Sequence, residues 1–246
     1  MPTTVTKTIK SAGGDYSTIG GWEAGEQKDF VAGDELGVGE CYAFQQTALV
    51  TIDGSTTDAT RHMKLTVHSS ARHAGIYDAS GSKFSWVSSG SGSQLQISDD
   101  YFEAEYLQMK STHASNGISI TVSNTGCVLS QIIATKATLN GVISVASGGT
   151  NAILRNCIVY GGAASHGCIE VQATGVELDN CTTVAGAGYG VQSGAAVNVT
   201  LKNCYSGGNT TADYAKGTSA GTSGWTYTTC MSVSYTHLTL PTNREV

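Results

Sequence analysis

The sequence predicts an all-β chain: a right-handed parallel β-helix solenoid with a short N-terminal capping helix. The prediction rests on composition, on a repeat of 23 to 26 residues and on short β-like runs between turn residues. Glycine accounts for 31 of 246 residues, about twice the usual share of roughly 7%, whereas proline accounts for 2. Charged residues make up 13%, about half of the usual quarter. This balance favours strands joined by many turns.

Charge and hydropathy exclude several partners. The net charge is −6 and Lys and Arg do not cluster, so we expect neither a nucleic acid nor an anionic membrane surface as partner. No stretch approaches the roughly 18 apolar residues that suggest a membrane span. Met1 is followed by a polar segment, so the chain as given is expected to lack a signal peptide.

The repeat is clearest in the second half, where Leu-x-Asn-Cys occurs at residues 154–157, 178–181 and 201–204. Stacked coils place equivalent residues about 4.8 Å apart, so the sequence predicts columns of like side chains. The aliphatic column is Leu129, Leu154, Leu178 and Leu201, and the corner column is Asn156, Asn180 and Asn203. A further column is Leu107, Ile132, Cys157, Cys181, Cys204 and Cys230. Asn suits such a corner because it tolerates the left-handed backbone conformation.

A second set of strands precedes these columns in each repeat. Apolar and polar residues alternate over 118–120, 142–145, 169–171 and 190–192, as in half-buried strands. Gly, Ser, Asn and Thr clusters between the runs are typical of turns.

The seven cysteines leave two interpretations open. Stacked thiols could bind metal or form disulfides, but an odd number without Cys-x-x-Cys pairs supports neither a closed disulfide framework nor a zinc ribbon. Buried free Cys behaves as a small hydrophobic residue, and the column continues as Ile132 and Leu107. We therefore favour interior packing.

The first half differs, since 14 of the 19 acidic residues precede residue 113. We expect a strand over 5–9, a turn at 13–15 and a helix over 17–27 with Ile19 and Trp22 on one face. A helix here would cap the open end of the solenoid. The predicted organisation is 1–40 strand and capping helix, 41–96 irregular first coils, 97–232 regular coils and 233–246 a tail.

A family resemblance is carried by residues 8–19 (TIKSAGGDYSTI), 22–24 (WEA), 51–61 and 97–101. These segments resemble right-handed β-helix (pectin-lyase-like) proteins of environmental bacteria and their phages, and the resemblance covers most of residues 5–232. It implies the fold, but the superfamily includes pectate lyases, polygalacturonases, phage tailspikes and members without known activity.

The resemblance directs the search for a site toward acidic clusters that bind Ca²⁺ in the lyases and paired carboxylates in the hydrolases. Asp99, Asp100 and Glu103 are the candidate catalytic residues. Neighbouring strand residues point to opposite faces, and Asp at a solvated turn is the competing interpretation. Ca²⁺ is expected if the lyase alternative holds; otherwise we expect no cofactor and no metal.

The sequence offers two other candidate sites, a group of three histidines and a pair of glutamates. His62, His68 and His73 lie within 12 residues, which could indicate a metal or acid–base site. However, no Asp or Glu lies between residues 61 and 76, and the spacing does not fit a zinc pair on a helix. Glu170 and Glu177 fall on successive strands of one coil and are expected to face different sides.

Two function classes follow. The favoured one is a non-catalytic β-helix of a phage virion appendage or cell-surface assembly, with exposed Tyr, Trp, Ser and Asn contacting carbohydrate or protein. The alternative is a polysaccharide lyase or glycoside hydrolase. The expected location is a virion, the cell surface or the extracellular space; a surface polysaccharide is the expected partner, and a homotrimer stays open.

Residues 233–246 break the repeat and lack its Gly-rich turns. They resemble a translated sequencing-library adapter, as found at the ends of assembled metagenomic fragments. We expect this tail to be non-native and to replace further coils or a capping or trimerisation segment.

Overall fold

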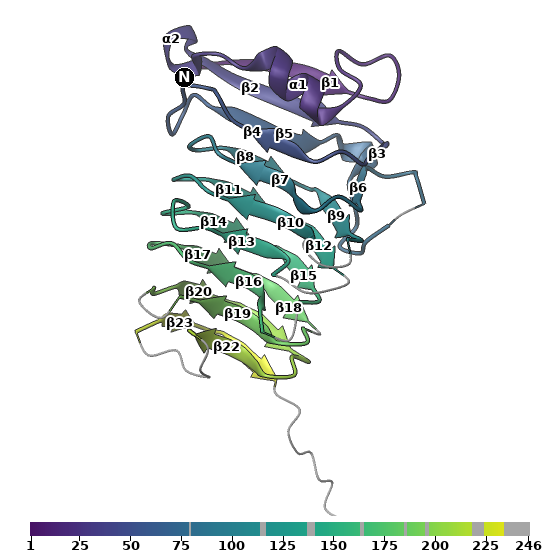
Figure 1. Ribbon diagram of the computed structural model, residues 1–246. Coiled ribbons are helices and arrows are strands. Elements are labelled where there is room, and N and C mark those ends of the chain that lie inside the picture. Colours follow the sequence, from purple (N-terminus) through teal and green to yellow (C-terminus); the bar gives the residue numbers. More distant parts are fainter. Residues whose placement is uncertain are drawn as a thin grey trace, which may run out of the picture.

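The computed structural model describes residues 1–78, 80–113, 117–136, 141–162, 165–184, 186–194, 197–217 and 224–233. These residues form a parallel β-solenoid of about 7 turns, with three sheets that run along its length (Figure 1). The chain winds from the N-terminal strands at one end, drawn in purple, to the yellow strands at the other. This confirms the predicted all-β solenoid.

Each sheet collects one strand from successive coils. The nine-stranded sheet contains β1 (Thr3–Ile9), β2 (Glu35–Cys41), β5 (Met63–Val67), β8 (Glu103–Glu105), β11 (Val128–Ser130), β14 (Ile153–Arg155), β17 (Glu177–Asp179), β20 (Thr200–Lys202) and β23 (Thr226–Thr228). The seven-stranded sheet contains β4 (Val50–Ile52), β7 (Gly92–Ile97), β10 (Gly117–Val122), β13 (Ile143–Val145), β16 (Gly167–Val171), β19 (Tyr189–Ser193) and β22 (Ala212–Lys216). The eight-stranded sheet contains β3 (Gln45–Gln46), β6 (Ser85–Ser88), β9 (Gln108–Ser111), β12 (Ile133–Lys136), β15 (Ile158–Tyr160), β18 (Thr182–Val184), β21 (Tyr205–Gly207) and β24 (Met231–Val233).

The N-terminal helix predicted from the sequence forms as α1 (Ile19–Glu26). Thr18 begins it by accepting the Gly21 amide at 3.0 Å, and Ile19 and Trp22 are fully buried. A short helix, α2 (Phe30–Gly33), follows, and one 3-10 turn, η1 (Ser69–Ala71), lies further along. In Figure 1, α1 lies at the N-terminal end of the stack beside β1 and β2. The described helices do not have the length and apolar character needed to cross a membrane.

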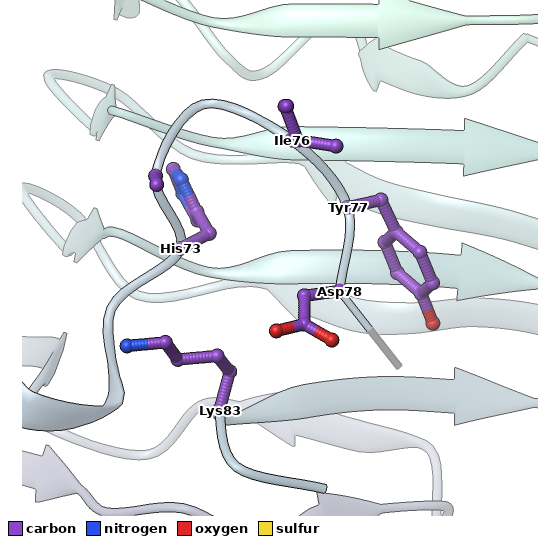
Figure 2. Close-up of a pocket in the computed structure, with 6 residues that line it drawn as sticks. His73, Ile76, Tyr77, Asp78 and Lys83 are labelled. Atoms are coloured by element: carbon purple, nitrogen blue, oxygen red, sulfur yellow. The ribbon is translucent and has the colours of Figure 1, made fainter. Parts of the chain in front are cut away.

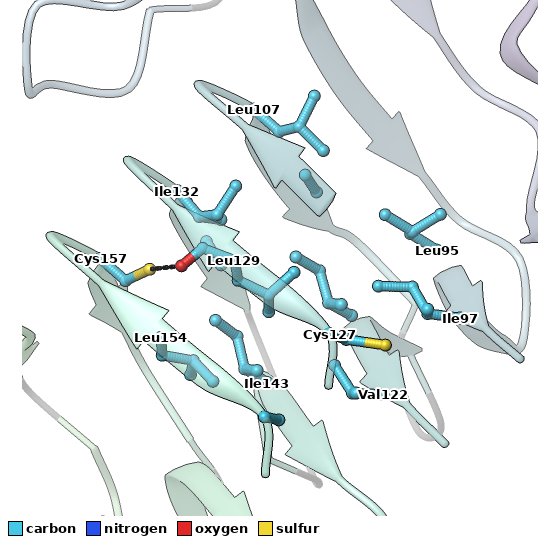
Figure 3. Close-up of a cluster of buried hydrophobic side chains, with 14 of the residues drawn as sticks. Leu95, Ile97, Leu107, Val122, Cys127, Leu129, Ile132, Ile143, Leu154 and Cys157 are labelled. Atoms are coloured by element: carbon cyan, nitrogen blue, oxygen red, sulfur yellow. Dashed lines mark hydrogen bonds between the residues drawn. The ribbon is translucent and has the colours of Figure 1, made fainter. Parts of the chain in front are cut away.

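The predicted columns stack in register. Leu129, Leu154, Leu178 and Leu201 occupy equivalent positions of β11, β14, β17 and β20, and all are fully buried. Figure 3 shows Leu129 and Leu154 pointing into the same interior as Ile143 and Val122 of the seven-stranded sheet. The runs predicted as the second set of strands lie within β10, β13, β16 and β19. Apolar burial inside the coils is therefore continuous along the solenoid.

The left-handed conformation occurs at the corner after six strands of the nine-stranded sheet: β8, β11, β14, β17, β20 and β23. Asn156, Asn180 and Asn203 have φ values of 53, 51 and 51°, and the Asn180 amide donates to Asn156 Oδ1 at 3.3 Å. Tyr106 and Gln131 occupy the same corner in earlier coils with φ values of 60 and 57°. The corner expected from the asparagine ladder is confirmed, although its first members are not asparagines.

The cysteine column is interior, as predicted. Cys157, Cys181 and Cys204 are at most 3% exposed, and each thiol lies against a carbonyl of the preceding coil, Cys157 Sγ at 3.7 Å from Leu129 O (Figure 3). The neighbouring Cys157 thiol and burial raise the pKa of Cys181 well above its ordinary value. Cys230 is partly exposed. All seven cysteines are free thiols.

The expectation of exposed tryptophans is wrong, because Trp22 and Trp86 are fully buried and Trp225 is 8% exposed, each packed into the solenoid core. The proposed adapter tail lies outside the described residues except for Val233, which pairs with Gly207 at the end of β24.

Replacing Cys181 tests the register. Cys181→Val should change the free energy of unfolding by less than about 1.5 kcal/mol, because the volume is nearly conserved. Cys181→Asp should cost several kcal/mol, because it buries an unpaired charge. Urea denaturation of both variants measures this, and an unchanged midpoint for Cys181→Asp would contradict the interior position.

Candidate functional site

Asp99 and Asp100 lie at the corner between β7 and β8. Asp99 is 5% exposed, and its carboxylate oxygens lie 3.2 and 3.3 Å from the Ser55 amide nitrogen, which donates to them. Asp100 Oδ1 accepts the Thr125 amide of the next coil at 3.1 Å. The solvated-turn interpretation is therefore wrong for Asp99, because the segment around Ser55 folds over it. Both carboxylates tie neighbouring segments together.

Burial raises the pKa of Asp99 above its ordinary value, against the opposing effect of the Ser55 amide. Asp53 and Glu23 add weaker like-charge repulsion. A carboxyl group with a raised pKa is suited to acid catalysis only if a substrate can reach it. Here the group is buried and bonded to the backbone, an arrangement typical of a structural role.

Glu103 belongs to a different arrangement, on the outer face of the nine-stranded sheet. Its carboxylate lies 3.0 Å from Lys64 Nζ and 3.5 Å from His62 Nε2, and Lys64 also reaches Glu105 at 2.8 Å. His62 and Lys64 lower the pKa of Glu103 to about 2. We call His62, Lys64, Glu103 and Glu105 the β5–β8 charge cluster. The structure therefore does not bring Glu103 and Asp99 together as an acid–base pair: each has its own partners.

The β5–β8 charge cluster could not be recognised in the sequence, because His62 and Lys64 belong to one coil and the two glutamates belong to the next. Lys64 pairs with Glu103 in register, 39 residues later in the chain, whereas the regular coils repeat every 23 to 26 residues. No acidic residue lies between positions 61 and 76, but the next coil supplies two. Extending the register from Ala104 back to Leu65 is the signal that could have revealed it.

The three clustered histidines separate in the structure. His62 faces Glu103, His68 stacks on Tyr42 with 4.3 Å between ring centroids, and His73 Nε2 lies 2.7 Å from Gln131 O. Within the described residues, no three His, Cys, Asp or Glu side chains are arranged to hold a metal ion. At the β5–β8 charge cluster, Lys64 lies against both carboxylates, so these residues do not fit the Ca²⁺ expected for a lyase.

The two later glutamates lie on different sheets, as expected. Glu170 on β16 pairs with His166 at 2.5 Å, and Glu177 on β17 pairs with Lys202 at 2.9 Å. Neither pair brings a second carboxylate into hydrogen-bonding range.

The segment between β5 and β6 forms a loop that leaves the coil and crosses the corner column. The Arg72 guanidinium lies 3.8 Å from the centre of the Tyr106 ring, and His73 reaches the Gln131 carbonyl. Tyr106 and Gln131 are the corner residues of two successive coils, so the loop lies against both. We call residues 68–78 and 80–84 the corner loop.

Gln108 holds the corner loop from beneath. This residue of β9 is fully buried, and its amide nitrogen donates to Asp78 O and Phe84 O, each at 2.6 Å. Its amide oxygen accepts the Asp78 N–H at 2.6 Å. One side chain thus satisfies three backbone groups of the loop, as a neighbouring strand would.

The corner loop encloses a pocket of about 340 Å³. The pocket is lined by His73, Ala74, Ile76, Tyr77, Asp78 and Lys83 (Figure 2). In Figure 2, His73, Asp78 and Lys83 surround the space below the arch of the loop, and Ile76 lies on the arch. Ile76 is 74% exposed.

The polar groups of the pocket have defined states. Burial lowers the pKa of His73, while its Nε2 faces the Gln131 carbonyl and its Nδ1 accepts the Gly75 amide at 3.3 Å, which fixes a neutral imidazole. Hydrogen bonds from Ser80 lower the pKa of Asp78, so its carboxylate is ionised. The Tyr77 hydroxyl is buried without a hydrogen-bond partner. Sequence reasoning considered His73 and missed the other lining residues, because the loop is outside the repeat.

Comparison with known proteins supports the fold. No protein-family model matches the sequence, and a search of curated proteins gives no match. The crystal structure of pectate lyase Pel9A aligns with a TM-score of 0.61 and 11% identity, over 85% of this chain and 55% of the lyase. Pectin methylesterase from Aspergillus niger, in deglycosylated form, aligns with a TM-score of 0.59 and 13% identity, over 95% of this chain and 93% of the esterase.

The chain is thus a parallel β-helix with a pectin-lyase-like fold. It spans about half the length of the pectate lyase. At these identities the likeness shows the fold alone.

Gln108→Leu should detach the corner loop. The substitution leaves three partly or fully buried backbone groups without this partner, so we expect a loss of about 2 kcal/mol in the free energy of unfolding. Limited proteolysis should cut faster within residues 68–84. Gln45→Leu, on an exposed position of β3, is the matched control. Equal cleavage of both variants would contradict the role of Gln108.

Glu103 should make the stability depend on acid pH. Its folded-state pKa of about 2 is below the ordinary 4.5, so its stabilising contribution is complete above pH 4.5 and disappears as the pH falls toward 2. Wild type should be more stable than Glu103→Gln at pH 7, and urea unfolding should show the difference shrinking between pH 4.5 and 2. A constant difference would show that Glu103 is not the titrating group.

Proposed function

We propose that this chain is a carbohydrate-contacting β-helix of a virion appendage or cell-surface assembly, without polysaccharide-cleaving activity of its own. The observation that carries the proposal is the pocket under the corner loop, which combines an ionised Asp78, the Lys83 ammonium and an aromatic residue in one small cavity. Pockets of roughly 300 Å³ or more with few polar groups are typical ligand sites.

The chemistry of the pocket suits a sugar. Sugar hydroxyls both donate and accept hydrogen bonds, and the pocket offers a carboxylate acceptor and an ammonium donor. Ile76 and Tyr77 add apolar surface for the carbon face of a ring. The position of the loop, against two successive corners, keeps this pocket on a supported part of the solenoid.

The acidic residues support the non-catalytic part of the proposal. Asp99 and Asp100 bond to backbone amides of other segments, and Glu103 pairs with Lys64. A catalytic pair would place two carboxyl groups on either side of a substrate bond. Attachment to a virion or cell surface, assembly as a homotrimer and an end-capping role for α1 belong to the same proposal and extend the family resemblance.

The alternative is a polysaccharide lyase or glycoside hydrolase. The β5–β8 charge cluster favours it, because it puts an ionised Glu103 beside a lysine and a histidine on an outer sheet face. The fold is also that of a pectate lyase and a pectin methylesterase. In that alternative the cluster would be the active site.

A depolymerisation assay separates the two functions. We expect no cleavage of pectate, alginate or bacterial surface polysaccharides, measured by viscosity and by release of unsaturated or reducing ends, with and without Ca²⁺. Cleavage that is abolished in Asp100→Asn or Glu103→Gln would establish the enzyme alternative.

A glycan microarray tests binding. Wild type should bind a subset of glycans, and Lys83→Met should weaken that binding by about tenfold or more, since a hydrogen bond to a charged group contributes about 1.5–3 kcal/mol. Lys110→Met is the matched control, because Lys110 is exposed on β9 outside the pocket lining. Equal binding by both variants would remove the pocket as the site.

A further inference from the structure

The pocket under the corner loop holds one ionised group of each sign. Asp78 and Lys83 both line it, and their opposite charges attract each other, which helps keep Asp78 ionised. His73 contributes no charge, because both of its ring nitrogens are engaged as a neutral imidazole. The lining is therefore balanced in charge, and Figure 2 shows Asp78 and Lys83 bordering the same space below the arch of the loop.

From this balance we propose that the pocket selects an uncharged sugar unit over a uronate or other anionic sugar. The inference rests on the proposed function, since it assigns the ligand class of the same pocket. Two neighbouring hydroxyls of a neutral sugar can donate to the Asp78 carboxylate and accept from the Lys83 ammonium. An anionic sugar that approaches Lys83 also approaches Asp78, and the repulsion offsets the attraction.

Lys83 is already engaged, which weakens it further as an anion receptor. Its ammonium donates to the Ser70 carbonyl at 3.1 Å. An ammonium keeps further protons for hydrogen bonding after that contact, so a hydroxyl can still be bound. A carboxylate ligand would contact a single ammonium that already donates to Ser70. A guanidinium, in contrast, can bind a carboxylate through two parallel hydrogen bonds. The nearby Arg72 cannot serve easily, because it stacks on Tyr106 and donates to Val67 O at 2.8 Å.

The decisive experiment compares neutral and acidic glycans on one microarray, carrying neutral hexose and N-acetylhexosamine glycans beside uronate-containing, sialylated and sulfated ones. Wild type should bind neutral glycans preferentially. Asp78→Asn keeps the size of the side chain and an acceptor oxygen but removes the charge, and should raise binding to acidic glycans by about tenfold. Asp179→Asn removes the same charge from β17, outside the pocket lining, and should change neither class.

The outcomes separate the two proposals. Preferential binding of acidic glycans by wild type, lost in Lys83→Met, would overturn the neutral-sugar inference and keep the carbohydrate-binding function. Binding of no glycan, or binding insensitive to Lys83→Met, would overturn the function and the inference with it. An equal effect of Asp78→Asn and Asp179→Asn on acidic glycans would show that net charge, not the pocket, sets the preference.

Discussion

The register of the backbone hydrogen bonds between coils is the constraint on which the rest of the structure depends. Each coil repeats the path of the one before, so equivalent residues lie on top of one another in all three sheets. A slip of one residue would turn Leu154 and Leu178 outward and bury their charged neighbours. The register stacks the leucines in one column. Because each leucine is fully buried, the apolar burial in turn stabilises this register against a slip.

The register also requires each of these coils to turn at the same place, and different residue types occupy that corner position in different coils. From β8 onward, a left-handed residue after each strand of the nine-stranded sheet lets the chain turn into the next sheet, and Asn adopts that conformation at little cost. Tyr106 and Gln131 adopt it at greater cost. These are the two corners that the corner loop covers, through the Arg72–Tyr106 contact and the His73–Gln131 bond. Where the asparagine ladder is absent, tertiary contacts thus support the turn, and the same contacts position the pocket.

This division explains what the sequence could predict. The regular coils could be predicted because the same residue pattern recurs in each of them. The three Leu-x-Asn-Cys segments predict the buried leucine column, the left-handed corner and the column of thiols. The role of Gln108 could not be predicted in this way. Its hydrogen-bond partners Asp78 and Phe84 belong to the corner loop, which has no counterpart in the other repeats. The burial of Asp99 could not be predicted for the same reason. Its exposure is set by Ser55, 44 residues earlier, and not by the neighbouring residues that make it look like a turn.

The interior changes character toward the C-terminal coils. The inward column of the eight-stranded sheet runs from Met109, Ala134 and Val159 to Thr183, Ser206 and Ser232. Burying hydroxyls is unfavourable unless they are hydrogen-bonded. The two buried hydroxyls are hydrogen-bonded: Thr183 donates to Ser206 at 2.8 Å, and Ser206 donates to Asp213 O at 3.1 Å. Ser232 is exposed at the end of the column and donates to Asp213 Oδ2 at 2.6 Å.

This hydroxyl network replaces apolar contact by directional bonds, and it restricts its surroundings more strongly. A Cβ on Gly190 would lie 1.9 Å from Ser206 Oγ and 2.7 Å from Thr183 Oγ1, so the network fixes glycine at that position of β19. Upstream, Leu and Ile fill space and tolerate small adjustments, whereas hydrogen bonds lose strength steeply with distance and angle. In the last coils the hydroxyl network therefore holds the register together with the buried Leu178 and Leu201, whereas the inward column of the earlier coils acts through the volume of its side chains.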